Sequence, residues 1–235
     1  MRISLNTLPL SGSSPITAGV NGASNTTQTN LNFILQALLV AQNYYQTRLQ
    51  AAQLASVTIP PYCVDFAPSN NGSVISYTEL YIFALYLTDP NQAYGATGKS
   101  CLYVTGTGVD NTLQVGRPIV GRIIFNTYNL VDTAASLTNM LFQSVTATTI
   151  HEMTHVLGFD ATLYNTYLDV LTGLPYNYTV RLDNSSLINS NRPPTSLIVT
   201  PNVKAWAQAH FGCNTLPGMV LENQDASGQS GGSHW

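Results

Sequence analysis

Hydrophobic side chains return every three or four positions in two long stretches of the chain, and this period predicts two amphipathic helices. The first stretch runs from Leu31 to Ala52 and is closed by Pro60-Pro61. The second ends at Gly158, a residue that can take the left-handed conformation with which many helices end. A shorter helical pattern covers residues 201–211 and begins at a proline, which is favoured in the first turn of a helix.

Between the two long helices, three apolar runs predict strands. Residues 79–87 are rich in Tyr, Ile, Phe and Leu and stop at Asp89-Pro90, which is typical of a buried strand. Residues 101–105 and 119–125 are the other two candidates, with glycine-rich connections between them. A helix, several strands and a second helix predict an α/β (α+β) fold in which the second helix packs beneath a sheet.

Composition divides the rest of the chain into segments of different character. Residues 1–29 are rich in Ser, Thr, Asn and Gly, and we expect them to be poorly ordered. Residues 30–159 form the expected N-terminal subdomain with both long helices. Residues 160–201 contain several prolines and predict a long surface insertion. Residues 202–235 then begin a C-terminal subdomain, which closes with a Gly/Ser-rich loop.

The second long helix carries the sequence Ala-Thr-Thr-Ile-His-Glu-Met-Thr-His-Val-Leu-Gly-Phe over residues 147–159. Residues four apart on a helix lie about 40° apart around its axis, so His151 and His155 can each direct a ring nitrogen at one ion. Glu152 lies one step round, close enough to touch a metal-bound water without binding the metal. His-Glu-x-x-His is the pattern of a zinc site with its own general base, and it predicts a zinc peptidase.

Histidine pairs at this spacing also arise by chance on surface helices, but the rest of this helix argues against chance. Small residues share the side of the two histidines, whereas the opposite half of the helix is apolar. The apolar positions are Phe142, Val145, Met153, Val156 and Leu157. We therefore expect one face to pack into a core and the other to stay clear for a ligand.

A catalytic zinc ion needs a third protein ligand, and known patterns suggest two sources. A thermolysin-like site takes a glutamate from a following helix, and Glu222 is the one glutamate after residue 152, without a convincing helix around it. A metzincin uses His-Glu-x-x-His-x-x-Gly-x-x-His. This chain matches that pattern through Gly158, but its third histidine position is Ala161. A third histidine would have to come from further along the chain.

Two histidines remain as candidates for that position. His210 lies on the predicted helix beside Trp206 and Phe211, where a packed or surface role is favoured. His234 follows Gly231-Gly232-Ser233, and glycines allow the backbone to come close to a metal. The chemistry of the residues favours His234 only modestly.

Three segments together resemble the leishmanolysin family of surface glycoproteins, which are metzincins. They are His-Glu-Met-Thr-His-Val-Leu-Gly-Phe, then Ala-His-Phe-Gly-Cys-Asn-Thr-Leu-Pro-Gly-Met-Val-Leu-Glu-Asn-Gln, then Gly-Gly-Ser-His-Trp. The resemblance is specific over residues 147–159 and 206–235. It is looser over residues 30–146, where the segment Gly-Arg-Pro-Ile-Val-Gly (116–121) is similar, and says little about residues 1–29 or 160–200.

The resemblance implies a zincin-like fold with a twisted mixed sheet over the helix of the active site. His151, His155 and His234 would bind one Zn²⁺ ion, because in this family a large insertion separates the glycine from the last ligand. Glu152 would be the general base that takes the proton as a zinc-bound water attacks the scissile carbonyl. The substrates would be polypeptides in extended conformation that pair with an edge strand beside the cleft. The family also implies proteolysis outside the cell and a role in cell adhesion.

Some features of the family are missing from the sequence. The methionine turn of metzincins should follow the third histidine, but the chain ends one residue after His234, and Met219 comes before it. The further C-terminal domain, and the GPI anchor of some members, are also missing. We therefore expect a C-terminally truncated fragment in which Cys213 has lost its disulfide partner. Membrane association is expected only through the missing segments.

The charge of the chain narrows the range of partners. Charged residues make up 8% of the sequence and the formal net charge is −3. The sequence has no basic run, so we expect no nucleic-acid partner. The most apolar window, Leu31 to Ala41, is interrupted by Asn32 and Gln36 and is too short to cross about 30 Å of hydrocarbon.

The cysteines and sequons favour the secretory route, and hence an extracellular or cell-surface location. Cys63 and Cys101 flank a strand-like segment and are expected to pair, which leaves Cys213. The alternative is three reduced, buried thiols. The four Asn-x-Ser/Thr sequons are at Asn25, Asn71, Asn177 and Asn184. No apolar signal-peptide core is visible in residues 1–20.

A second hypothesis is a catalytically inactive surface or adhesion glycoprotein on the same scaffold. The missing methionine turn and the sequons favour this interpretation. The intact His-Glu-x-x-His pattern argues against it, because no structural role requires the glutamate.

Overall fold

The structure, a computed structural model, describes most of the chain in two compact units, Met1–Gly158 and Phe159–Trp235. The described residues are 1–7, 26–64, 67–104, 116–132, 137–169, 171–176, 180–183 and 195–222. The boundary between the units follows Gly158, whose φ of 111° is one that residues with a side chain rarely adopt.

The first unit is built on a mixed four-stranded sheet with the order β1-β4-β6-β5. Its strands are β1 (Ile3–Asn6), β4 (Leu80–Leu87), β5 (Ala96–Tyr103) and β6 (Pro118–Asn126). Strand β4 pairs in parallel with both β1 and β6, whereas β5 is antiparallel to β6. The two central strands are almost entirely buried because both faces of the sheet are covered.

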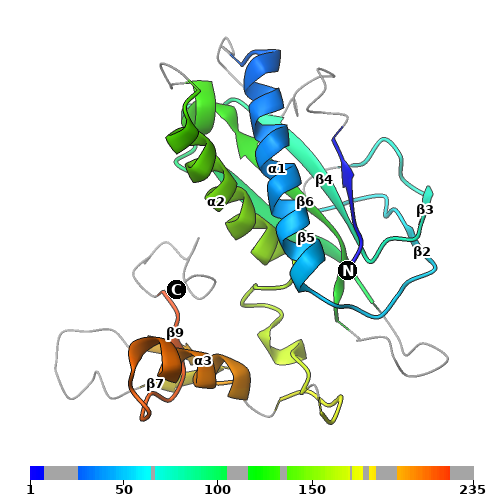
Figure 1. Cartoon of the computed structure of the whole chain (residues 1–235). Helices are drawn as coiled ribbons and strands as arrows, with labels where there is room; N and C mark the ends of the chain where they lie inside the picture. Colours follow the sequence, from blue (N-terminus) through cyan, green and yellow to red (C-terminus); the bar gives the residue numbers. More distant parts are fainter. Residues whose placement is uncertain are drawn as a thin grey trace. The chain divides into compact units, whose positions relative to one another are not determined.

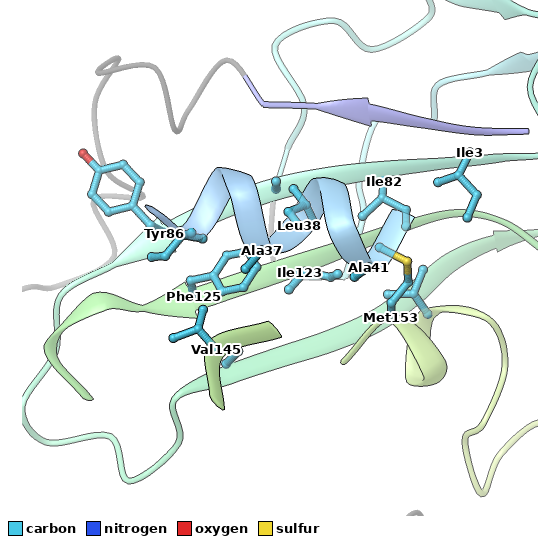
Figure 2. Packing of buried hydrophobic residues seen from close by; sticks show 14 of the residues in the cluster. Ile3, Ala37, Leu38, Ala41, Ile82, Tyr86, Ile123, Phe125, Val145 and Met153 are labelled. Carbon is cyan, nitrogen blue, oxygen red and sulfur yellow. The ribbon is translucent and has the colours of Figure 1, made fainter. Parts of the chain in front are cut away.

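Helices α1 (Gln28–Arg48) and α2 (Asn139–Val156) run side by side over one face of this sheet (Figure 1). Threonine side chains cap both helices: Thr27 accepts a hydrogen bond from the Asn30 amide, and Thr138 from the Leu141 amide. Figure 2 shows the core beneath them. It joins small and large apolar side chains of the two helices to those of the strands, among them Ala37, Leu38, Ala41, Ile82, Ile123, Phe125, Val145 and Met153.

The opposite face of the sheet is covered by the segment between α1 and β4. This segment contains the antiparallel pair β2 (Ser56–Thr58) and β3 (Val74–Ser76). A disulfide bond joins Cys63 to Cys101 on β5, the pair expected from the sequence. The sequon residue Asn71 lies exposed in a turn before β3. A short π-helical segment, Tyr128–Asp132, follows β6.

The second unit has a small sheet of its own with the order β7-β8-β9. Strands β7 (Val180–Asp183), β8 (Thr195–Ile198) and β9 (Met219–Val220) pair in antiparallel fashion. Along the chain, a 3-10 turn (Tyr164–Thr166) precedes these strands, and helix α3 (Pro201–Phe211) follows β8 and precedes β9. A hydrophobic cluster in this unit contains the buried side chains of Tyr164, Ile198 and Leu221.

Three expectations from the sequence need correction. Residues 3–6 form strand β1, although all of 1–29 was expected to be poorly ordered, because their backbone completes one edge of the sheet. Strand β5 begins at Ala96, ahead of the expected residue 101. The sequence pattern missed its first residues because they include a glycine and polar side chains, which are not typical of a buried strand. Residues 160–201 are not only a surface insertion, because β8 contributes buried side chains to the core of the second unit.

No helix of the described residues is long and apolar enough to cross a membrane. The sequons at Asn25, Asn177 and Asn184 lie outside the described residues.

Strand β1 is held by an ion pair between Arg2 and Glu79, the residue before β4. The Arg2 amide donates to Glu79 Oε2 at 2.6 Å and the Arg2 Nε to Oε1 at 3.0 Å. Burial raises the pKa of the Glu79 carboxyl, but the hydrogen bonds and the charge of Arg2 outweigh burial and hold that pKa below its usual value.

We predict that Glu79→Gln lowers the free energy of unfolding by about 1 kcal/mol at neutral pH. A carboxyl with a lowered folded-state pKa stabilises above its unfolded pKa and loses this effect as the pH falls through the folded value. The difference between wild type and variant should therefore shrink toward pH 3, as measured by urea unfolding at several pH values. A difference independent of pH would contradict this role of the ion pair.

Candidate metal centre

Helix α2 has its rotation about its own axis fixed by contacts on two sides. Val145, Met153 and Val156 are completely buried against the sheet, as the apolar half of the helix predicts. On the side of α1, the Tyr45 hydroxyl lies 2.6 Å from Thr154 Oγ1 and donates to the Ile150 carbonyl at 3.2 Å. These contacts leave the edge of α2 that carries His151 exposed.

His151 and His155 converge as the helical spacing predicts. Their Nε2 atoms lie 3.1 Å apart, and the two rings are nearly perpendicular with centroids 4.7 Å apart. His155 is 9% exposed, whereas His151 is open to solvent. The His155 ring is thus held in the protein interior, and the His151 ring lies on the solvent side of the pair.

The pair fits a zinc ion. Two nitrogens at bond lengths of 2.0–2.1 Å from a tetrahedral ion are separated by about 3.3 Å, which is close to the observed distance. Within the described residues, no group of three or more histidine, cysteine, aspartate or glutamate side chains gathers as a metal site. Among the described residues, His151 and His155 are brought together as a candidate pair of metal ligands.

Glu152 lies beneath strand β5. The sequence had predicted only that it lies on the flank of the histidine pair. Its side chain is 8% exposed, and Oε2 accepts a hydrogen bond of 2.6 Å from the amide of Gly98. Burial raises the pKa of the Glu152 carboxyl to about 7, although the hydrogen bond from Gly98 opposes that rise. A carboxyl with this pKa can both accept and donate a proton near neutral pH.

The other candidates for the third ligand fall in the second unit. His234 lies outside the described residues, so its predicted role stays a prediction. His210 is exposed on α3. Its ring stacks on that of Trp206, with ring centroids 4.6 Å apart, and makes an edge contact with the ring of Phe211. Glu222 follows strand β9 and lies on no helix, unlike the glutamate of a thermolysin-like site.

The profile of the leishmanolysin family matches residues 101–235, which is more than half of the chain and includes both histidines of α2. The chain belongs to the leishmanolysin family. This is a family of metallopeptidases, as the resemblance in the sequence implied. Membership makes a metal cofactor plausible and is compatible with the mixed sheet of the first unit.

The chain is also similar to leishmanolysin-like peptidases of animals. A leishmanolysin-like peptidase of Caenorhabditis briggsae is 30% identical over 172 residues, which cover 62% of this chain and 25% of that protein. A leishmanolysin-like peptidase of Drosophila melanogaster is 31% identical over 144 residues, covering 51% of this chain and 20% of that protein. The aligned region thus spans a quarter or less of the length of these relatives.

The sequence did not identify Gly98 as part of the site. An isolated glycine within a strand often marks a close approach of two backbones, and this signal was available. It was hidden because the strand itself was expected to start only at residue 101. The partnership with Glu152 depends on two segments 54 residues apart and has no local signature.

We predict that Zn²⁺ raises the unfolding temperature of the full chain and that His155→Ala and His151→Ala each abolish most of this rise. A ligand that binds the folded state stabilises it by mass action, so losing one ligand weakens the stabilisation. Differential scanning fluorimetry with and without Zn²⁺ measures it. His210→Ala, which changes an exposed histidine of α3, is the control and should respond as wild type does. An undiminished rise in the His155→Ala variant would refute this assignment.

Proposed function

We propose that this member of the leishmanolysin family is a zinc-dependent metalloendopeptidase. The observation that carries the proposal is the arrangement on one helical turn of α2. Two imidazole nitrogens lie 3.1 Å apart there, and the carboxyl of the residue next to His151 is buried and held by strand β5. The family supports a metallopeptidase, and the choice of zinc follows from the nitrogen ligands and the His-Glu-x-x-His pattern.

His151 and His155 would hold the ion, with His234 as the third ligand on the strength of the family resemblance. When bound, zinc supplies a Lewis acid that polarises the scissile carbonyl and makes water acidic enough to attack near neutral pH. The buried position of His155 would limit the motion of its ring and so favour a fixed geometry of binding.

Glu152 would act as the general base. Its carboxyl would take a proton from the attacking water and return that proton to the nitrogen of the leaving amine. In the absence of a metal, burial raises the pKa of this carboxyl to about 7, and a raised pKa makes it a better proton acceptor. The neighbouring ion would favour the ionised form and thus prepare the base for the first step.

The substrate would be an extended polypeptide that adds to the outer edge of β5. This strand is the last in the order of the described sheet, and it contacts the residue proposed as the base. An edge strand offers backbone hydrogen bonds to an incoming strand without regard to the substrate sequence. The peptide bond to be cleaved would then be presented beside α2.

An extracellular or cell-surface location is also proposed. The bond between Cys63 and Cys101 supports an oxidising compartment, and the exposed turn that contains Asn71 could accept a glycan.

We predict that Glu152→Gln leaves zinc bound but lowers peptide cleavage by about 100-fold or more, because general acid–base catalysis contributes factors of this size. Glutamine keeps the shape of the side chain but cannot take up the proton. Zinc content is measured by atomic emission, and cleavage by the release of fragments from an unfolded protein. Retained cleavage would refute the assignment of the base. Absence of stoichiometric zinc from the wild-type chain would favour the inactive adhesion glycoprotein.

We predict that His234→Ala weakens zinc binding strongly, whereas Glu222→Ala and His210→Ala do not. A site left with two protein ligands loses one of three coordinate bonds, and zinc should be lost to a competing chelator at lower concentration. Titration of each variant with a chromophoric chelator compares them directly. An effect confined to Glu222→Ala would point to a thermolysin-like site and overturn the choice of His234.

A further inference from the structure

Helix α2 meets the sheet at two glycines, Gly98 on β5 and Gly121 on β6. A Cβ atom on Gly98 would lie 2.1 Å from the carbonyl oxygen of Glu152, and one on Gly121 would lie 2.5 Å from Val156 Cγ1. Real Cβ atoms almost never approach other atoms within 3.0 Å. Any side chain at position 98 would therefore push the helix backbone away from the strand at the residue proposed as the base.

The close approach at Gly98 also creates a polar contact. The Gly98 amide donates to Glu152 Oε2 at 2.6 Å, and both residues are buried. Hydrogen bonds to an ionised carboxylate are shorter and about twice as strong as neutral ones. A glutamate side chain without such a partner samples several rotamers, whereas a carboxylate tied to a strand amide is restricted to one position.

We propose that Gly98 is a positioning residue for Glu152, which its amide holds in place beside the two histidines. This inference rests on the proposed function, in which Glu152 is the base. The amide fixes Oε2 and leaves Oε1 to exchange the proton with the attacking water. Gly98 itself touches no reacting atom.

The position of Gly98 would also link the base to the substrate. Strand β5 is the proposed edge for the extended peptide, so the same strand would set the register of the substrate and the place of the carboxyl. A shift of about 1 Å between such groups can lower the rate by roughly 100-fold. A base anchored to the substrate-binding strand would keep this distance constant.

The hydrogen bond itself is tested without reference to catalysis, in the full-length zinc-loaded chain labelled with ¹⁵N. We expect the Gly98 amide proton to resonate far downfield and to exchange slowly with solvent. Glu152→Gln, which keeps an oxygen acceptor, should preserve slow exchange, whereas Glu152→Ala should shift the resonance upfield and speed its exchange. A Gly98 amide that is unaffected by Glu152→Ala would overturn the proposal.

The effect on catalysis is tested by removing the amide proton alone. Cell-free translation with glycolic acid at position 98 replaces the Gly98 N–H by an ester oxygen and adds no side chain. We expect zinc content and KM to be unchanged and kcat to fall about 10- to 100-fold, the effect of losing one hydrogen bond to a charged group. Unchanged kcat, or a rise in KM alone, would overturn the proposal.

Gly121→Ala provides the matched control, because it keeps the Gly98 N–H while its Cβ would press on α2 through Val156 Cγ1 at 2.5 Å and on β5 through the Lys99 carbonyl oxygen at 2.8 Å. This variant should unfold at lower temperature, keep the downfield Gly98 resonance and lose less kcat than the ester. An equal loss of kcat in the two variants would assign the effect to helix packing and overturn the role of the amide. Failure of the proposed function is a separate result: the wild-type chain would then hold no stoichiometric zinc, or Glu152→Gln would retain cleavage, whatever the Gly98 resonance shows.

Discussion

The site depends on the close packing of helix α2 against strands β5 and β6. Two glycines allow the helix to approach the sheet more closely than any side chain would permit. This approach buries Val145, Met153 and Val156 and, on the same helix, brings Glu152 beneath β5. Because a helix is rigid over one turn, the position of Glu152 also fixes that of the two histidines.

The site combines groups that a protein core normally excludes with the apolar face that forms the core. A buried carboxyl is costly unless it is hydrogen-bonded or neutral. The Gly98 amide offsets part of this cost for Glu152, and the cost that remains raises the pKa of the carboxyl to about 7. His155 is almost as buried as Glu152, whereas His151 faces solvent. One turn of α2 thus carries both buried and exposed polar side chains, which suits the proposed activity, because buried groups are held still while an exposed group can be reached by water and substrate.

The two edges of the main sheet are treated differently. At one edge, β1 is short and is held by the pair between Arg2 and Glu79. At the other edge, β5 is longer, is joined to the covering segment by the disulfide at Cys101, and donates an amide to α2. An edge strand is a risk for uncontrolled pairing with other chains. The β1 edge is held by the ion pair between Arg2 and Glu79. The β5 edge lies where pairing with a peptide would serve the proposed activity.

The sequence by itself determined the helices, the buried strand before Asp89, and the pairing of His151 with His155, because each of these follows from a short-range period or spacing. It also indicated the family, through motifs at residues 147–159 and 206–235, both of which lie within the matched region. Strand β1 was missed because its Ile-Ser-Leu-Asn alternation is only four residues long and precedes a segment rich in Ser, Thr, Asn and Gly. The early start of β5 was missed because Ala96–Ser100 contains a glycine and polar residues, which form a strand there through pairing with the neighbouring backbone. The contact between Gly98 and Glu152 was decided by tertiary structure alone. It joins residues 54 positions apart, and no local pattern encodes the distance between a helix and a strand that meet only after the core has packed.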